Sequence, residues 1–177
     1  GSGASALPAR ASTPVGAGDA GAEHGGMGGS APRPWAPDSL AADVVPRIVA
    51  PVVSELARRG GDSSGAFTGL LYAGLDLTSS GPQVIEFNCR FGDPETQVVI
   101  PRLKSDLLEI LWAVANNRLA DAAIEWSTEA TVGVVMVSGG YPDDYTTGHE
   151  IAGLRSVDED VLVFHAGTNL KDDGAVV

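Results

Sequence analysis

The sequence predicts an α+β fold, in which helices accompany short antiparallel strands. Apolar residues recur at four-residue spacing between Leu40 and Leu56, which is typical of an amphipathic helix. Residues 67–88 hold two β-rich runs separated by a short polar turn, which is typical of a hairpin. A second helical pattern follows at 105–119, and short β-rich runs return after it. We therefore expect an antiparallel sheet with helices, followed by the start of a β-rich C-terminal domain.

The N-terminal stretch differs in composition from the rest of the chain. The chain holds 23 Gly and 11 Pro, and residues 1–22 consist mostly of Gly, Ala, Ser and Pro. Such a segment buries too little apolar surface to offset the entropy lost on ordering. We expect residues 1–22 to form a disordered arm and the glycine-rich stretch from Gly25 to Pro37 to form a loop.

The first helix is predicted from Leu40 onwards, with Asp38 as a suitable N-cap residue. Pro46 and Pro51 lie inside the pattern, and because proline removes a helical hydrogen bond we expect a kink or break there. The pair Gly60-Gly61 predicts the end of this helix.

The hairpin is predicted to consist of Phe67–Thr78 and Pro82–Asn88, joined at Ser79-Ser80-Gly81. With the turn centred there, Gly74 lies opposite Glu86, and Asp76 lies opposite Val84. The two β-rich runs then bring the end of the second strand to the side of the hairpin away from the turn.

The remaining elements are a helix over Ser105–Leu119, with Ser105 as its N-cap, and strands over Thr131–Ser138 and Val161–His165. The side chains expected to be buried are those of Tyr72, Cys89 and Trp112.

Charge and hydropathy restrict the classes of partner. The net charge is −12, from 11 Lys and Arg against 23 Asp and Glu, and binding to a polyanion requires clustered basic residues. Nucleic acid is therefore not an expected partner, whereas a metal ion can still help hold a small phosphorylated ligand. No apolar run approaches the roughly 20 residues that span a bilayer. A single cysteine and the lack of a signal-peptide pattern favour a cytoplasmic protein without a membrane partner.

The end of the predicted hairpin carries the candidate chemistry. Glu86 and Asn88 are two residues apart on a strand, so their side chains lie on one side, and hard cations such as Mg²⁺ prefer such oxygen ligands. Arg90 continues the alternation if the strand persists, which places a forked cation where phosphate oxygens would be held. The same spacing is equally typical of the solvated face of an ordinary strand. The acidic turn at Gly92–Glu95 favours the cation-binding interpretation, because clustered carboxylates repel one another without cations.

The run VIEFNCRFGDPETQ, from Val84 to Gln97, closely resembles the signature of the phosphoribosylamine–glycine ligase family, which are ATP-grasp enzymes of purine synthesis. Roughly residues 15–177 share the resemblance. Its other segments are Gly18–Pro34, Phe67–Thr78, Pro101–Leu111, and the stretches GYPDDYTTGHEIAGL and VFHAGTNLKD.

The resemblance implies site roles. Glu86 and Asn88 match ligands of the Mg²⁺ or Mn²⁺ ion that bridges the phosphates of ATP, the co-substrate. Arg90 is the implied catalytic residue, which holds a phosphate oxygen and stabilises an acyl-phosphate formed from glycine. The residues implied to bind substrate are Asp93, Pro94 and Glu95. The implied partners are ATP, glycine and phosphoribosylamine, and no oligomeric state is implied.

The resemblance also implies a domain organisation. Residues 23–128 match the C-terminal part of an ATP-grasp domain, and residues 129–177 match a truncated β-rich C-terminal domain. The family carries further domains upstream that do not occur in this sequence, so we expect this polypeptide alone to be inactive. Two alternatives stay open: a non-catalytic ATP-grasp remnant or interaction module, and an ATP-grasp ligase for another carboxylate.

Overall fold

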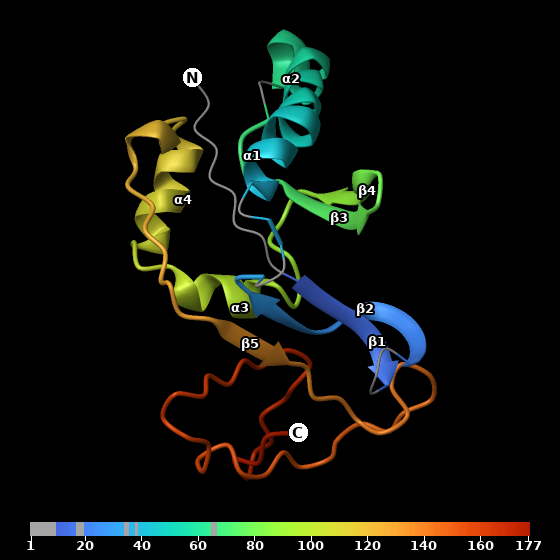
Figure 1. Cartoon of the computed structure of the whole chain (residues 1–177). Coiled ribbons are helices and arrows are strands. Elements are labelled where there is room, and N and C mark those ends of the chain that lie inside the picture. The colour runs from blue at the N-terminus through green and yellow to red at the C-terminus, as the bar shows by residue number, and fades with distance from the viewer. Residues whose placement is uncertain (1–9, 17–19, 34–35, 38, 65–66) are drawn as a thin grey trace. The chain divides into compact units, whose positions relative to one another are not determined.

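The computed structural model describes residues 10–16, 20–33, 36–37, 39–64 and 67–177. The chain divides into two units, Gly1–Val134 and Val135–Val177. Every helix and strand found in the described residues belongs to the first unit (Figure 1). The first unit mixes helices with antiparallel sheets, as the sequence predicts.

A three-stranded antiparallel sheet is formed by β1 (Arg10–Gly16), β2 (Ala20–Ala31) and β5 (Thr131–Val134), in the order β1-β2-β5. The predicted disordered arm was therefore wrong for 10–16 and 20–22, whereas 1–9 and 17–19 lie outside the described residues. The glycine-rich loop predicted from Gly25 to Pro37 was wrong for Gly25–Ala31, which belong to β2, whereas the described residues 32–33 and 36–37 lie outside helices and strands.

The glycines of β2 explain why this segment pairs and packs as a strand. A Cβ atom at Gly26 would collide with Cδ of Pro94, and one at Gly28 would lie 2.5 Å from the carbonyl oxygen of Gly133 in β5. Glycine in a strand often marks such close approach. These glycines therefore permit tight packing, and the composition alone gave no sign of it.

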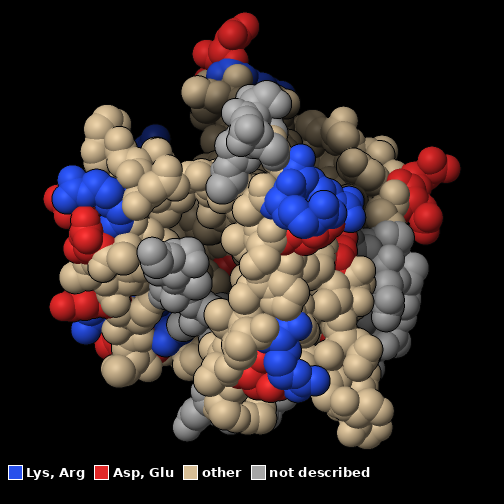
Figure 2. Space-filling model, turned by 90° about the horizontal axis from the view of Figure 1, so that it is seen from above, with Lys and Arg blue, Asp and Glu red and all other residues tan. Residues whose placement is uncertain are grey.

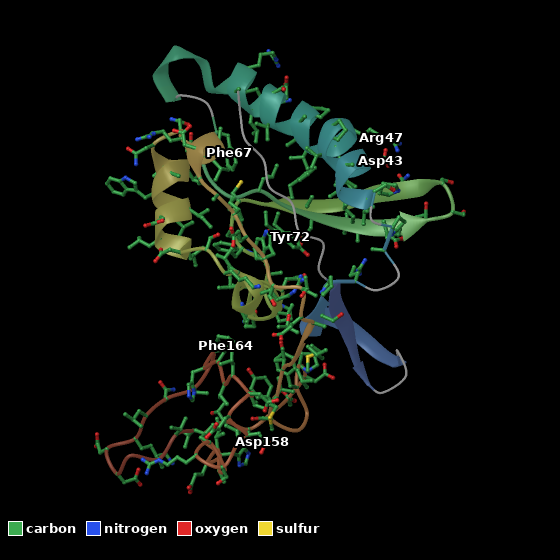
Figure 3. All side chains as sticks on the ribbon, turned by 60° about the vertical axis from the view of Figure 1, so that its left-hand side comes forward. Asp43, Arg47, Phe67, Tyr72, Asp158 and Phe164 are labelled. Carbon is green, nitrogen blue, oxygen red and sulfur yellow. The ribbon has the colours of Figure 1, made fainter. Side chains whose placement is uncertain are left out.

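The first helical region has three parts: α1 (Leu40–Val44), the π-helical turn η1 (Val45–Val49) and α2 (Ala50–Ser64). The predicted break coincides with η1, which begins one residue before Pro46, and proline cannot supply the regular helical hydrogen bond. The predicted end at Gly60-Gly61 was wrong, because α2 continues to Ser64. The predicted N-cap, Asp38, lies outside the described residues. Arg47 forms an exposed ion pair with Asp43 at 2.8 Å (Figure 3).

The hairpin is confirmed as β3 (Tyr72–Thr78) and β4 (Gly81–Asn88), although β3 begins five residues later than predicted. Gly74 pairs with Glu86, as predicted. Asp76 pairs with Gln83 and not with Val84, because the register shifts between Gly74 and Leu75. The shift affects only the half of the hairpin near the turn.

Four short helices follow: α3 (Thr96–Val99), the 3₁₀ turn η2 (Ile100–Arg102), α4 (Leu107–Ala115) and the 3₁₀ turn η3 (Leu119–Asp121). The N-cap of α4 is Asp106, whose Oδ1 accepts the Glu109 N–H at 3.0 Å. The predicted cap Ser105 was wrong by one residue, and its hydroxyl accepts the Glu125 N–H instead. Trp112 is 70% exposed, so its predicted burial was wrong.

The packing centre of the first unit lies where α3 meets β2 and β5 (Figure 1). Val98 of α3 is fully buried, and its carbonyl accepts the Thr131 hydroxyl. Arg102 is also buried, and its guanidinium donates to the carbonyls of Ser127 and Glu129. These contacts fix the chain on both sides of α4 to the sheet.

The second unit, Val135–Val177, consists of turns and irregular chain with one isolated bridge, between Leu170 and Val176. The predicted strand Val161–His165 was wrong: all five residues are described and none lies in a strand. The strand predicted over Thr131–Ser138 ends at Val134. None of the helices in the described ranges combines the length and apolar character needed to cross a membrane.

Candidate functional site

The end of the hairpin away from its turn places two oxygen-bearing side chains together. Tyr72 pairs with Asn88 and Gly74 pairs with Glu86, so these four residues share one face of the two strands. Asn88 Nδ2 donates to Glu86 Oε1 at 2.8 Å. The prediction that Glu86 and Asn88 project on the same side is confirmed.

The Glu86 side chain lies over Gly74. A Cβ atom at Gly74 would be 3.2 Å from Glu86 Cγ, so a larger residue there would press on the carboxylate arm. Glu86 is exposed to solvent, and among the described residues only its Oε1 accepts a hydrogen bond. The carboxylate is therefore held loosely on one side and is accessible on the other.

Glu86 and Asn88 have the chemistry of a divalent-cation site. Carboxylate and amide oxygens suit Mg²⁺ and Mn²⁺, which commonly take few protein ligands and complete their shell with water and phosphate oxygens. In the part of the chain that the structure describes, no three His, Cys, Asp or Glu side chains form a metal-binding group. The pair therefore fits an ion shared with a phosphorylated ligand better than an ion enclosed by protein.

Arg90 lies just beyond the strand. β4 ends at Asn88, so the strand alternation does not extend to Arg90. Arg90 Nη1 donates to the carbonyl of Phe91 at 2.8 Å, and the side chain is exposed. Its guanidinium has four further N–H donors for an anion. Cys89 is also exposed, so its predicted burial was wrong.

The acidic turn after the hairpin separates its three predicted substrate-binding residues by burial. Asp93 is exposed, and its Oδ1 accepts Gln97 Nε2 at 3.0 Å. Pro94 is buried against Gly26 of β2, and Glu95 is only 7% exposed. Among the three, only Asp93 presents its side chain to solvent.

Tyr72 connects the hairpin to this turn. Its hydroxyl donates to Glu95 Oε1 at 2.7 Å. Burial raises the pKa of the Tyr72 phenol, as do the hydrogen bond to Glu95 and the negative charges of Glu95 and Glu86, whereas Arg90 lowers it. The phenol therefore stays protonated at neutral pH and acts as a donor.

The sequence placed Tyr72 in the core and did not link it to the site. The side chain is in fact half-buried, at the hairpin end far from the turn (Figure 3). The signal was present in the predicted register, since pairing Gly74 with Glu86 also pairs Tyr72 with Asn88. Burial of Glu95 had no comparable signal, because it depends on packing between distant segments.

The charged side chains elsewhere are dispersed. On the face seen from above, basic and acidic side chains lie in small mixed groups (Figure 2). Several are ion pairs along helices, including those of Glu55 with Arg58 and Arg59. Such exposed pairs contribute little to stability and mark no site by themselves.

Comparison with known proteins gives the geometry a family context. The sequence model described as "Phosphoribosylglycinamide synthetase, ATP-grasp (A) domain" matches residues 3–96, and the one described as "Phosphoribosylglycinamide synthetase, C domain" matches residues 131–177. The first match includes every candidate site residue from Glu86 to Glu95.

Relatives share similarity along most of the chain. It is 48% identical to the phosphoribosylamine–glycine ligase of Mycobacterium tuberculosis, over 97% of this chain and 39% of that protein. It is also 48% identical to the ligase of Escherichia coli O157:H7, over 92% of this chain and 38% of that protein. The crystal structure of the Thermotoga maritima ligase matches with a TM-score of 0.78 and 29% identity, over 96% of this chain and 41% of that one. The chain thus spans about two fifths of the length of these relatives.

Proposed function

Because the chain belongs to the phosphoribosylglycinamide synthetase family, we propose that it supplies the metal- and phosphate-binding edge of an ATP-dependent ligase. The ligase would join glycine to phosphoribosylamine. One observation carries the proposal: Glu86 and Asn88 contact each other at 2.8 Å on one face of the hairpin end. Arg90 and Asp93 follow within five residues and are both exposed.

The proposed reaction has two steps. A carboxylate oxygen of glycine attacks the γ-phosphorus of ATP, forming glycyl-phosphate and releasing ADP. The amine of phosphoribosylamine then attacks the glycyl carbonyl and displaces inorganic phosphate, so that an amide bond replaces the acyl-phosphate bond. The protein contributes mainly by positioning the reactants and neutralising charge.

Glu86 and Asn88 would hold the Mg²⁺ or Mn²⁺ ion, which when bound supplies positive charge against the ATP phosphates. The exposed guanidinium of Arg90 would donate to an oxygen of the transferred phosphoryl group. The exposed carboxylate of Asp93 provides an electrostatic hold for the glycine ammonium. Glu95 is too buried to share that role directly.

Metal binding is testable on the chain as it stands. Free Mn²⁺ is measured by electron paramagnetic resonance during titration of the wild-type chain, of Glu86→Gln and of Glu109→Gln. Glu109 is an exposed acid on α4 and serves as the control. We expect Glu86→Gln to weaken Mn²⁺ binding by about tenfold or more, since it removes a charged ligand. Equal affinities of Glu86→Gln and wild type would contradict the proposed metal role.

The substrate is tested in a chimera, because the chain spans 39% of the M. tuberculosis ligase. The remaining part of that ligase is fused upstream, and ADP release is followed with and without glycine. Release that requires glycine, phosphoribosylamine and Glu86 is the expected result. Release without glycine dependence would indicate a different carboxylate substrate, and an inactive, correctly folded chimera would favour a non-catalytic role.

A further inference from the structure

Tyr72 stands on the same face of the hairpin as the two candidate metal ligands and also contacts the acidic turn. It pairs with Asn88 across the strands, and its hydroxyl donates to Glu95 Oε1 at 2.7 Å. We propose that Tyr72 and Glu95 are positioning residues, which hold the turn Gly92–Glu95 at a fixed place beside the Glu86–Asn88 pair. This inference rests on the proposed function and assigns a role to residues behind its reacting groups.

The Tyr72 ring packs closely between two glycines, Gly74 and Gly92. A Cβ atom at Gly74 would be 3.7 Å from Tyr72 Cε1, and one at Gly92 would be 2.9 Å from Tyr72 Cε2. The ring therefore lies between a glycine of the hairpin and a glycine of the turn. Because both neighbours lack side chains, the ring can pack closely against backbone on both edges and reach Glu95.

Glu95 is held equally closely. A Cβ atom at Gly92 would collide with Glu95 Oε2, and the Glu95 carbonyl accepts hydrogen bonds from the N–H groups of Val98 and Val99 in α3. The residue is only 7% exposed. Its hydrogen bond from Tyr72 therefore connects the hairpin to the first turn of α3, and the exposed Asp93 lies on the segment between them.

The charges around the phenol favour this geometry. Burial raises the pKa of the Tyr72 phenol most, and the hydrogen bond to Glu95 and the negative charges of Glu95 and Glu86 raise it further, so the hydroxyl retains its proton. Glu95 Oε1 accepts the hydrogen bond from that hydroxyl, so Glu95 is a buried acceptor and not an open ligand. The family resemblance implies that Glu95 contacts the substrate directly. In this proposal Glu95 acts indirectly, by holding the turn in place.

The test uses the whole chain and two measurements. Mn²⁺ affinity is determined for wild type, Tyr72→Phe, Glu95→Ala, the double variant, Glu95→Gln, and the control Tyr141→Phe. Tyr141 packs edge-on against Tyr145 in the second unit, outside the first unit that holds the site. Tyr72→Phe retains the ring and removes only the hydroxyl, and far-UV circular dichroism checks that each variant is folded.

We expect Tyr72→Phe and Glu95→Ala each to weaken Mn²⁺ binding by about tenfold, as does loss of a residue that orients a metal ligand. The double variant should be no weaker than either single variant, because both changes remove the same hydrogen bond. Glu95→Gln retains an acceptor oxygen and should bind nearly as well as wild type, as should Tyr141→Phe. A Glu95→Gln affinity as low as that of Glu95→Ala would show that charge acts and overturn the hydrogen-bond role.

Amide hydrogen exchange gives a readout without metal. Thr96 N–H donates to the Gly92 carbonyl at 3.0 Å and reports on the turn, whereas the Asn88 amide reports on the hairpin end. We expect Tyr72→Phe to speed exchange at both positions by about tenfold. Unchanged exchange together with unchanged Mn²⁺ affinity would overturn the positioning role alone. Failure of the wild-type chain to bind Mn²⁺ through Glu86 would overturn the proposed function and this role with it.

Discussion

The contact between Val98 and Gly133 joins α3 to β5 and can be tested by exchanging volume between the two positions. Val98 is fully buried, and a Cβ atom at Gly133 would lie 2.8 Å from Val98 Cγ1. We expect Val98→Ala and Gly133→Ala each to destabilise the first unit. The double variant should be more stable than the sum of the two changes predicts.

The magnitudes follow from the geometry. Val98→Ala removes two methyl carbons, at about 0.8 kcal/mol each for transfer, so with a cavity term the loss is roughly 2 kcal/mol. At Gly133 the added carbon would stand 2.8 Å from Val98 Cγ1. Carbon atoms prefer about 3.5–4.0 Å, and such overpacking costs roughly 1–3 kcal/mol. In the double variant the new Cβ occupies the space that the valine methyls leave, so we expect a coupling of roughly 1–2 kcal/mol.

The assay is urea unfolding of the wild type, both single variants and the double variant, followed by far-UV circular dichroism. Gly139→Ala controls for the effect of alanine on the unfolded chain, because a Cβ atom there has no neighbour within 4 Å. Additivity of the two single changes within about 0.5 kcal/mol would refute the contact. It would mean that α3 does not pack on β5 through these two residues.

Two further predictions concern the surroundings of the site. Gly26→Ala should lower the free energy of unfolding by roughly 1–3 kcal/mol, because its Cβ would collide with Pro94. Gly139→Ala, measured by the same urea titration, should not lower it, because alanine there meets no neighbour and only restricts the unfolded chain. Equal effects of the two variants would disprove the close approach. Because the pKa of Tyr72 is raised in the folded protein, its protonated phenol contributes stability at pH values below the unfolded pKa of about 10. This contribution is lost as the pH rises through the pKa of the folded protein. The free energy of unfolding, measured from pH 8 upwards, should therefore fall above about pH 10. The fall should be smaller in Tyr72→Phe than in the wild type, and identical pH profiles of the two would contradict the raised pKa of Tyr72.

The hairpin shows which features of strand pairing can be predicted from sequence periodicity. Two β-rich runs and a serine turn were enough to predict the pairing of Gly74 with Glu86 and the shared side of Glu86 and Asn88. The same reasoning failed at Asp76, because an irregularity adds one residue to β4 and shifts the register towards the turn. Alternation predicts which side a residue faces, but the sequence carries no clear sign of an inserted residue.

Local composition misled the prediction of β2. Many glycines and few large apolar residues favour disorder when a segment is considered alone. Their use in this fold depends on distant partners: Pro94 lies against Gly26, and the backbone of Gly133 lies against Gly28. Segments about 70 and 105 residues downstream along the printed sequence thus give these glycines their role. No pattern within β2 itself contains that information.

The three acids of the candidate site show the same limit, and burial assigns them different tasks. In the sequence alone, Glu86, Asp93 and Glu95 are three carboxylates within ten residues, equally suited to hold a cation or an ammonium group. Glu86 and Asp93 are exposed, so each can meet a ligand directly without first breaking a buried contact. Glu95 is enclosed and accepts the Tyr72 hydroxyl, so a ligand that claimed its carboxylate would have to replace that hydrogen bond. A buried carboxylate whose partner is already in place is better suited to fix the geometry than to bind substrate. Tyr72 and Glu95 are therefore the proposed positioning residues. The proposed contacts to metal and substrate belong to Glu86, Asn88, Arg90 and Asp93.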